Sequence, residues 1–276
     1  GIIDGQVHFR DPGLTHKGDL YTESKAAIAG GVTSFIDMPN TVPNILNVES
    51  LREKYDIASQ KSLANYSFFL GVNGDNIDDV IKMDTSQFIG VSDDGLYFTK
   101  KGNLLADSPE KMEKLFANCK SIIAIHSEKE EIVEANERIF KEKFGENIPA
   151  KYHPIIRNTE GCFEASKRAI EIAKKHNARL HILHLTTEAE THLFQNNIPL
   201  KEKKITTEVS VHHLWFSDKD YDQLGMLIKW NPAIKTEKDK KGLLKALLDD
   251  RIDILTTDHA PHTLEEKEQP YFQSMS

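Results

Sequence analysis

Short β-branched apolar runs alternate with amphipathic stretches eight times along this 276-residue chain. This alternation limits the fold more strongly than any other feature, because strands that alternate with helices form parallel sheets. The apolar runs predict strands over residues 6–10, 33–38, 67–72, 88–92, 121–125, 179–185, 204–210 and 253–257. The amphipathic stretches predict helices over residues 19–29, 48–60, 77–82, 109–118, 129–143, 160–176, 187–196 and 237–250.

Eight strand–helix repeats in a chain of this length are typical of an α/β fold of the (β/α)8, TIM-barrel kind. The alternative, a doubly wound open sheet, usually carries a glycine-rich phosphate loop after its first strand. Here the first strand ends in His8-Phe9-Arg10, without such a loop. We predict one barrel domain over residues 1–276, in which residues 263–276 are loop-like and the final covering helix is absent.

Composition excludes some classes of partner and location. The formal net charge of −8 argues against nucleic acid as a partner. The apolar runs fall well short of the roughly 18 residues that span a membrane, and the first residues lack a secretory signal. Cys119 and Cys162 show no metal-ligand spacing and predict no disulfide, so a reducing cytoplasm is expected.

Ligand-type residues follow the predicted strands, at the end of the barrel where catalytic groups collect. Singly they have ordinary interpretations: Asp93-Asp94-Gly95 is typical of a turn, and one histidine after a strand is typical of a loop. Together, at one end of the barrel, they predict a metal site. In chain order they are His8, Arg10, Asn40, Asp93, Asp94, His126, His184, His212, His213, Asn231, Asp258 and His262.

Neutral imidazoles with carboxylates suit Zn²⁺ best, with Mn²⁺, Co²⁺ and Fe²⁺ as alternatives. A metal held in this way lowers the pKa of bound water to about 7 and polarises a carbonyl. Asp258 is placed to take a proton from that water and pass it to a leaving nitrogen. Arg10 and His262 are suited to hold a substrate carboxylate, which an arginine can bind in bidentate fashion.

The segments 7–13, 38–41, 93–95, 231–232 and 258–262 resemble, in this order, those of the dihydroorotases, which are cyclic-amide hydrolases of the amidohydrolase superfamily. The resemblance implies reversible interconversion of dihydroorotate and N-carbamoyl-aspartate in pyrimidine biosynthesis, a small anionic substrate and often a homodimer. Dihydropyrimidinases and allantoinases share the metal residues of this family but usually differ at the substrate segments.

The resemblance also implies a role for each matching residue. His8 would bind one metal, and His126 and His184 a second; Asp93, in preference to Asp94, would bridge them. Asp258 would be both metal ligand and general acid–base. The substrate carboxylate would be held by Arg10, Asn40 and His262, and the ring contacted by Asn231.

Two departures from the family pattern stand out. The family has His-x-His on the first strand, where this chain has Gln6-Val7-His8. Because an amide is a weak Zn²⁺ ligand, we predict unequal occupancy of two sites, or one metal held mainly by the second set. His153 could compensate for the missing ligand, but an ordinary loop histidine is the expected interpretation. The family's flanking β-rich module is also missing, which predicts a fragment or a reduced form with weak stability or activity.

Two other functions remain as alternatives. A catalytically silent homologue would act as a structural partner of another pyrimidine enzyme, but such proteins typically lose several metal ligands, whereas only Gln6 departs here. A hydantoinase or allantoinase is the other alternative. Arg10, Asn40 and His262 together argue against it.

Overall fold

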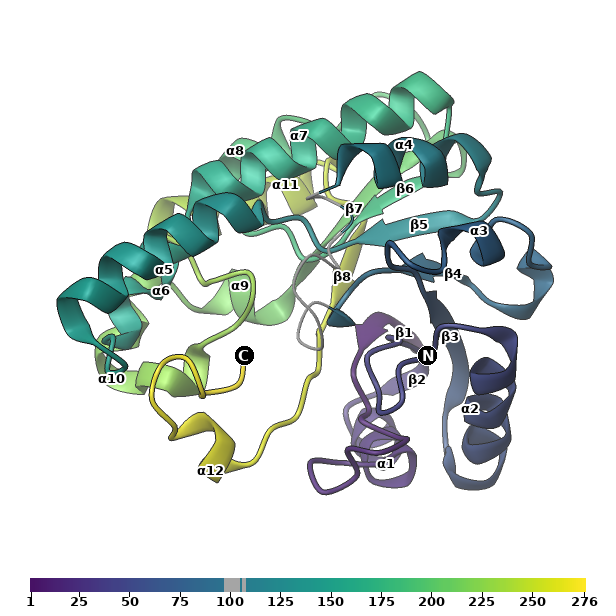
Figure 1. Cartoon of the computed structure of the whole chain (residues 1–276), viewed down its shortest axis with the longest axis horizontal. Helices are drawn as coiled ribbons and strands as arrows, with labels where there is room; N and C mark the ends of the chain where they lie inside the picture. Colours follow the sequence, from purple (N-terminus) through teal and green to yellow (C-terminus); the bar gives the residue numbers. More distant parts are fainter. Residues whose placement is uncertain (97–104, 106–107) are drawn as a thin grey trace. The chain divides into compact units, whose positions relative to one another are not determined.

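The computed structural model describes residues 1–96, 105 and 108–276 (Figure 1). Strands and helices alternate as predicted, and the eight strands take the sheet order β1 to β8. The chain divides into two compact units. The first comprises Gly1–His126, Ile172–His181 and Thr256–Pro261, and the second comprises Ser127–Glu171, Ile182–Leu255 and His262–Ser276. A single domain over residues 1–276 stays a prediction.

The first unit contains the first five strands, which pair in parallel with their neighbours along the chain. Helices α1 and α2 lie beside these strands in Figure 1. The elements are β1 (Ile2–Val7), α1 (Leu20–Ala29), β2 (Val32–Asp37), α2 (Val48–Lys61), β3 (Asn65–Gly71), α3 (Ile77–Val80), η1 (Thr85–Gln87), β4 (Gly90–Ser92), α4 (Pro109–Asn118) and β5 (Ile122–Ile125).

Side chains alternate between two faces along β1. One face packs into the core, and the other carries polar residues of the candidate site. Val7 and Phe9 are buried on one face, where the Phe9 ring lies 4.4 Å from that of Phe35. Burying such an aromatic ring is worth about 1.5–3 kcal/mol. Gln6 and His8 therefore extend to the opposite face, because successive side chains in extended backbone point to opposite sides.

Asp37, the last residue of β2, fixes the loops that follow the first two strands. Its Oδ1 accepts hydrogen bonds from the backbone N–H groups of Phe9 and Met38, each at 3.0 Å. Its Oδ2 lies 2.8 Å from the fully buried ammonium of Lys54, which also donates to the Met38 carbonyl. A paired, hydrogen-bonded buried charge of this kind holds one loop geometry, since losing either partner leaves the other uncompensated.

Backbone pairing joins the beginning of the chain to residues near 259. The His8 N–H donates to the His259 carbonyl at 2.8 Å, and Val7 forms a parallel bridge with His259. The Thr257 N–H and hydroxyl both donate to the Asp4 carboxylate. Residues about 250 apart in sequence are thereby brought together within the first unit.

The second unit contains most of the remaining elements. These are α5 (Glu130–Phe144), η4 (Ala150–Tyr152), α6 (His153–Ile156), α7 (Thr159–His176), β6 (Leu180–Ile182), α8 (Glu188–Thr191), η5 (Leu200–Glu202), β7 (Ile205–Ser210), α9 (Val211–Trp215), η6 (Asp218–Asp220), α10 (Tyr221–Leu224), η7 (Gly225–Ile228), α11 (Glu237–Leu248), β8 (Ile254–Thr256) and α12 (Leu264–Lys267). The C-terminal part of α7 and parts of β6 and β8 belong to the first unit.

One core cluster of the second unit is built around Val133, Ile148, Ile156 and Tyr271. His153 lies within this unit as the fully buried first residue of α6, so the expected loop histidine is wrong. Its Nδ1 is 2.8 Å from the Tyr271 hydroxyl and its Nε2 is 2.8 Å from the Trp230 carbonyl. An imidazole with both nitrogens occupied in this way is a structural residue.

Several predicted boundaries change, and three of the changes have a clear local cause. The first strand ends at Val7 instead of residue 10, because Arg10 has φ of 64°, in the left-handed region that a strand excludes. The helix predicted over 187–196 shortens to α8, ahead of Asn196 and Asn197, which are poor helix formers. The expected loop over 263–276 contains α12, since Thr263 and Glu266 form a capping box.

Candidate metal centre

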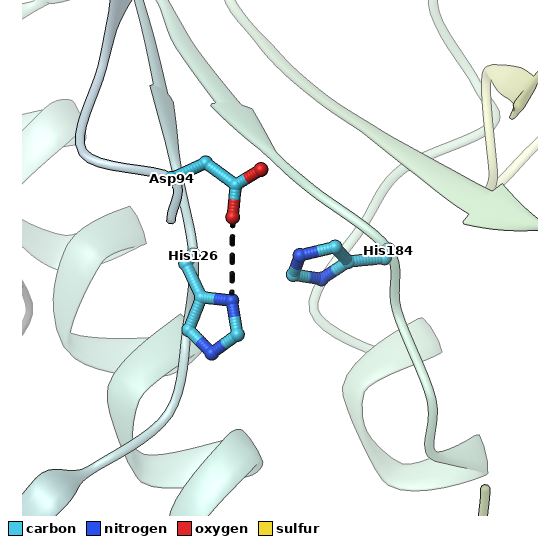
Figure 2. A group of neighbouring side chains, drawn as sticks. All are labelled: Asp94, His126 and His184. Atoms are coloured by element: carbon cyan, nitrogen blue, oxygen red, sulfur yellow. Dashed lines mark ion pairs between the residues drawn. The ribbon is translucent and has the colours of Figure 1, made fainter. Parts of the chain in front are cut away.

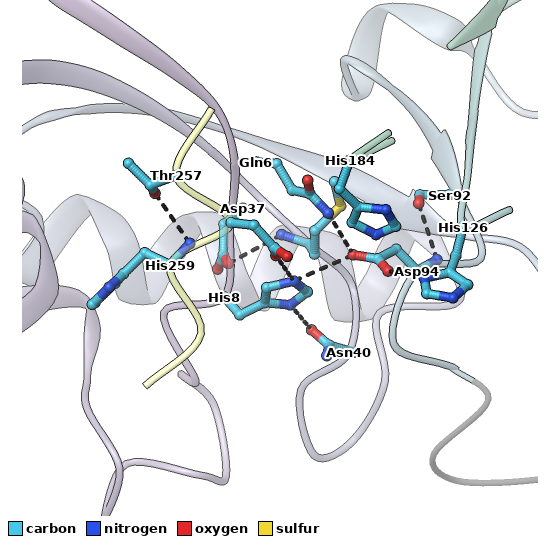
Figure 3. A network of polar contacts seen from close by, with 12 residues as sticks. Gln6, His8, Asp37, Asn40, Ser92, Asp94, His126, His184, Thr257 and His259 are labelled. Atoms are coloured by element: carbon cyan, nitrogen blue, oxygen red, sulfur yellow. Dashed lines mark hydrogen bonds and ion pairs between the residues drawn. The ribbon is translucent and has the colours of Figure 1, made fainter. Parts of the chain in front are cut away.

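His8 stands between two carboxylates in the first unit. Its Nε2 lies 3.1 Å from Asp258 Oδ1 and 3.2 Å from Asp94 Oδ2, and all three side chains are buried. Its Nδ1 lies 2.7 Å from Asn40 Oδ1 (Figure 3). One ligand-type atom from each of His8, Asp94 and Asp258 falls within 4.8 Å of the others.

The charges around His8 favour a cation at this point. Burial by itself lowers the pKa of His8, but the hydrogen bonds and charges of Asp258 and Asp94 outweigh burial and raise that pKa to about 10. In the metal-free protein, a proton on the imidazole therefore balances two buried carboxylates. A divalent ion would compensate the same two carboxylates with a larger positive charge than a proton does. The donor set therefore fits a metal.

Asn40 gives His8 the support that metal-binding histidines usually have. A ring nitrogen that donates to a side-chain or backbone oxygen leaves the other nitrogen free to face an ion. The Asn40 oxygen accepts from Nδ1 in this arrangement, and Nε2 faces the two carboxylates. Because that oxygen is used, only the NH₂ group of Asn40 remains to hold a substrate carboxylate.

Asp94 connects His8 to two further residues. Its Oδ1 lies 3.6 Å from Nδ1 of His126, which is fully buried after β5 (Figure 2). Its Oδ2 accepts a hydrogen bond of 3.0 Å from the amide of Gln6. The Ser92 hydroxyl accepts from the Asp94 N–H and holds the loop after β4. Asp94 thus contacts the two imidazoles of the first unit that were predicted to bind metal.

Asp93, the carboxylate preferred from the sequence, makes different contacts from Asp94, and its role as a metal ligand stays a prediction. Its Oδ1 accepts from the His126 N–H at 3.0 Å, and its Oδ2 accepts from the Leu105 N–H at 2.7 Å. Burial raises the pKa of Asp93 to about 7, although these backbone hydrogen bonds act in the opposite direction. Asp93 therefore positions backbone around the site, and Asp94 is the carboxylate that faces the imidazoles.

Gly95 makes room for Asn40. Its φ is +70°, and a Cβ atom at this position would lie 2.1 Å from Asn40 Nδ2. Any side chain at residue 95 would consequently displace the amide that orients His8. The turn expected at residues 93–95 is therefore also a requirement of the site.

Arg10 and Asp258 both adopt left-handed backbone, with φ of 64° and 49°. Such strain costs of order 1–3 kcal/mol per residue and tends to gather at functional sites. Arg10 is buried, and its Nε donates to the Pro261 carbonyl at 3.1 Å. This bond anchors the guanidinium beside the segment that carries Asp258.

The remaining predicted site residues belong to the second unit. His184 is buried just after β6 with φ of 32°, and its N–H lies 3.5 Å from Glu208 Oε1. His262 Nδ1 lies 3.1 Å from Glu266 Oε2. Asn231 is half-buried. Their roles as metal ligand, carboxylate holder and ring contact stay predictions.

Sequence reasoning missed two supporting residues. Asp37 carried a usable signal, since a carboxylate at the end of an apolar strand must find partners when buried. Gln6 was treated as a lost ligand, and its hydrogen bond to Asp94 carried no signal in the sequence. Only the spacing of two residues from His8 indicated that both side chains share one face.

Comparisons with known proteins identify the class. The model of the amidohydrolase family matches residues 1–275, so the chain belongs to the amidohydrolase family. The L-hydantoinase (dihydropyrimidinase) of Arthrobacter aurescens has a TM-score of 0.86 at 23% identity, covering 99% of this chain and 61% of that one. A dihydropyrimidinase from Brevibacillus agri NCHU1002 has a TM-score of 0.83 at 19% identity, with the same coverages. These likenesses confirm the predicted α/β barrel fold.

The curated relatives add a more specific likeness. The chain is 32% identical to the dihydroorotase of Methanosarcina mazei over 274 residues, and 34% identical to that of Carboxydothermus hydrogenoformans over 271 residues. These alignments cover 96% and 97% of this chain, and 58% and 60% of the relatives. The chain thus spans less than two thirds of the length of the relatives it matches.

None of the helices in the described part of the chain combines the length and the apolar character that crossing a bilayer requires.

Proposed function

We propose that this protein is a metal-dependent cyclic amidase that interconverts dihydroorotate and N-carbamoyl-aspartate. The observation that carries the proposal is the buried group of His8, Asp94 and Asp258, in which one imidazole faces two carboxylates. The chain is 31–34% identical to four curated dihydroorotases, including the two named above. This similarity supports the choice of substrate. The substrate is a small anion, and zinc is the proposed metal for the imidazole-rich part of the site.

The bound metal would supply Lewis acidity at the scissile amide and would be held by His8, Asp94 and Asp258. His126, which contacts Asp94, is proposed as a further ligand. His184 is also proposed as a metal ligand, as the resemblance implies. Asn40 keeps the His8 ring in the orientation that directs Nε2 toward the carboxylates. Asp94 therefore takes the bridging role first assigned to Asp93.

Asp258 is the proposed general base and acid. Its carboxylate takes a proton from the attacking water and returns it to the amide nitrogen as the C–N bond breaks. The left-handed backbone of Asp258 directs its carboxylate toward His8, whose Nε2 lies 3.1 Å from Oδ1. In the direction of ring closure, the same group would accept the proton from the carbamoyl nitrogen.

Arg10 is the proposed primary contact of the substrate carboxylate. Its Nε donates to the Pro261 carbonyl, which fixes the buried guanidinium, and the planar fork of an arginine suits a carboxylate. His262 and the NH₂ group of Asn40 are proposed to share this anion, and Asn231 to contact the ring. A site of this kind would disfavour hydantoins without a carboxylate, because they would lack the proposed contact with Arg10.

An ultraviolet assay of dihydroorotate, with chelator and with metal restored, tests the proposal. We expect turnover of dihydroorotate that the chelator abolishes and a divalent ion restores. Turnover of hydantoins alone would instead support a hydantoinase. Failure to turn over either substrate, with metal bound and the fold intact, would favour a silent partner of another pyrimidine enzyme.

A further inference from the structure

We infer that Gln6 is an oxygen ligand of the ion held by His8, Asp94 and Asp258, and that it shifts this position toward a hard divalent ion such as Mn²⁺ over Zn²⁺. The inference rests on the proposed function, since it needs a metal at this group. It assigns a role to the residue at which this chain departs from the His-x-His pattern.

Gln6 has the placement that such a ligand needs. Its side chain is fully buried near the end of β1, two residues before His8, and the two side chains lie on the same side of the chain. Its Nε2 lies 3.0 Å from Asp94 Oδ2, the same oxygen that lies 3.2 Å from His8 Nε2 (Figure 3). Its Oε1 is also buried and has no hydrogen-bond partner in the described part of the chain.

The two ends of this carboxamide are therefore not equally satisfied. Without an ion, the N–H group must face Asp94, because an amide oxygen against a carboxylate oxygen would repel it. A half-turn of the terminal torsion exchanges oxygen and nitrogen with almost no change in shape. In the present orientation the oxygen at the far end of the amide meets no partner among the described residues, so the charge next to Asp94 decides the orientation.

The separations suit a shared ion once the oxygen faces inward. Two ligand atoms bound to one octahedral ion at about 2.1 Å lie about 3.0 Å apart. The separation between Gln6 Nε2 and Asp94 Oδ2 is 3.0 Å, and those from His8 Nε2 to Asp258 and Asp94 are 3.1 and 3.2 Å. The half-turn would put the amide oxygen where the nitrogen now lies, 3.0 Å from Asp94 Oδ2.

The resulting donor set is dominated by oxygen. Two carboxylates, one amide oxygen and one imidazole surround the ion, and oxygen ligands suit Mn²⁺ and Mg²⁺ better than Zn²⁺. A histidine at residue 6 would add a second nitrogen and favour Zn²⁺. Gln6 thus gives the His8 position a different metal preference from the position proposed at His126 and His184.

Metal titrations of the metal-free protein test this inference without relying on turnover. Electron paramagnetic resonance counts bound Mn²⁺, and calorimetry gives the Zn²⁺ affinity, for the wild type and for Gln6→Leu, Gln6→His and Gln6→Glu. The variant His8→Asn identifies which Mn²⁺ ion belongs to this position. Gln60→Leu, at an exposed glutamine of α2, is the matched control.

We expect Gln6→Leu to weaken Mn²⁺ binding at the His8 position by on the order of 10- to 100-fold. Gln6→His should weaken Mn²⁺ and strengthen Zn²⁺, Gln6→Glu should strengthen Mn²⁺, and Gln60→Leu should match the wild type. Thermal unfolding of each metal-free protein checks the fold. If Gln6→Leu does not fold, the isosteric Gln6→Glu and the Gln6→His variants decide the matter.

Unchanged Mn²⁺ and Zn²⁺ affinities in the Gln6 variants that fold would overturn the inference and leave the proposed function intact. A wild type that binds no divalent ion at the His8 position would instead remove the basis of the proposed function. The two failures are therefore distinguished by the wild-type titration alone.

Discussion

Two histidines in this protein are both buried, but different partners surround their imidazole rings. His8 in the first unit faces Asp94 and Asp258, and its pKa is raised to about 10. His153 in the second unit faces a tyrosine hydroxyl and a backbone carbonyl. Burial, followed by the positive charges of Lys229 and Arg157, holds the pKa of His153 well below its usual value. Equal burial thus gives a cation in one place and a neutral ring in the other.

The difference shows how to separate a metal ligand from a structural histidine. Burial penalises the charged imidazole in both places, so only the partners distinguish them. Two carboxylates within 3.2 Å create a demand for positive charge, which a metal can meet. Neutral partners on both nitrogens create no such demand.

The largest expected effect is a loss of turnover when Asp258, a carboxylate beside His8, is replaced. Asp258→Asn keeps the shape of the side chain but removes the proton acceptor, so kcat should fall about 10²- to 10⁴-fold in the dihydroorotate assay. Asp222→Asn, at an exposed position of α10, is the control and should leave turnover unchanged. Near-normal turnover of Asp258→Asn would remove Asp258 from the mechanism.

The second prediction concerns His153. Replacing it by phenylalanine leaves the Trp230 carbonyl and the Tyr271 hydroxyl without their partner, at a cost of about 1–3 kcal/mol in the free energy of unfolding. Urea unfolding measures this loss, and the bound metal per chain should stay at the wild-type value. A loss of metal without a loss of stability would reverse the roles assigned to the two histidines.

The third prediction uses the pH dependence of stability to test whether His8 and His153 differ in charge. The folded-state pKa of His8 lies above the unfolded value near 6.5, so its stabilisation is complete below about 6.5 and is lost as pH rises through about 10. His153 has a lowered folded-state pKa, so its contribution is lost as pH falls below about 6.5.

Urea midpoints of the metal-free protein across this range measure both slopes. His8→Asn should flatten the alkaline slope and leave the acid slope, whereas His153→Phe should do the reverse. Saturation with a divalent ion should also flatten the alkaline slope, because metal binding displaces the proton. Identical slopes in both variants would show that the two rings do not differ in charge.

The smallest effect is expected at an exposed histidine next to the site. The His259 side chain is 44% exposed and pairs with Glu23 at 2.6 Å. A surface pair of this kind contributes at most about 1 kcal/mol, so His259→Asn should barely change the urea midpoint. Metal content and turnover should also be unchanged, in contrast to Asp258→Asn at the adjacent residue.

Much of the fold followed from the sequence because burial imposes periodicity. The β-branched runs at residues 33–38 and 204–210 became β2 and β7 almost as predicted, and the helix over 109–118 matched α4. The helix over 187–196 failed, because apolar residues at helical spacing do not outweigh the turn formers that follow.

The candidate site was harder to predict at the level of single atoms. Asp93 and Asp94 are adjacent, and only the turn geometry after β4 decides which carboxylate faces His8 and His126. Asn40 was expected to hold the substrate carboxylate, and its oxygen accepts from His8, so only its NH₂ group remains for that role. Residue type and position at a strand end indicate which residues gather, whereas backbone torsions and hydrogen bonds decide what each one contacts.

The hydrogen bond from the His8 N–H to the His259 carbonyl also governs when the site can form during synthesis. At about 5–20 residues per second, a ribosome needs tens of seconds to pass from residue 8 to residue 259. During that interval, the first strand has no neighbour on its outer edge, and His8 lacks the carboxylate of Asp258. The proposed ion at His8 would therefore be captured late, after residue 259 has been made. A stalled chain would expose an unpaired strand edge that invites aggregation.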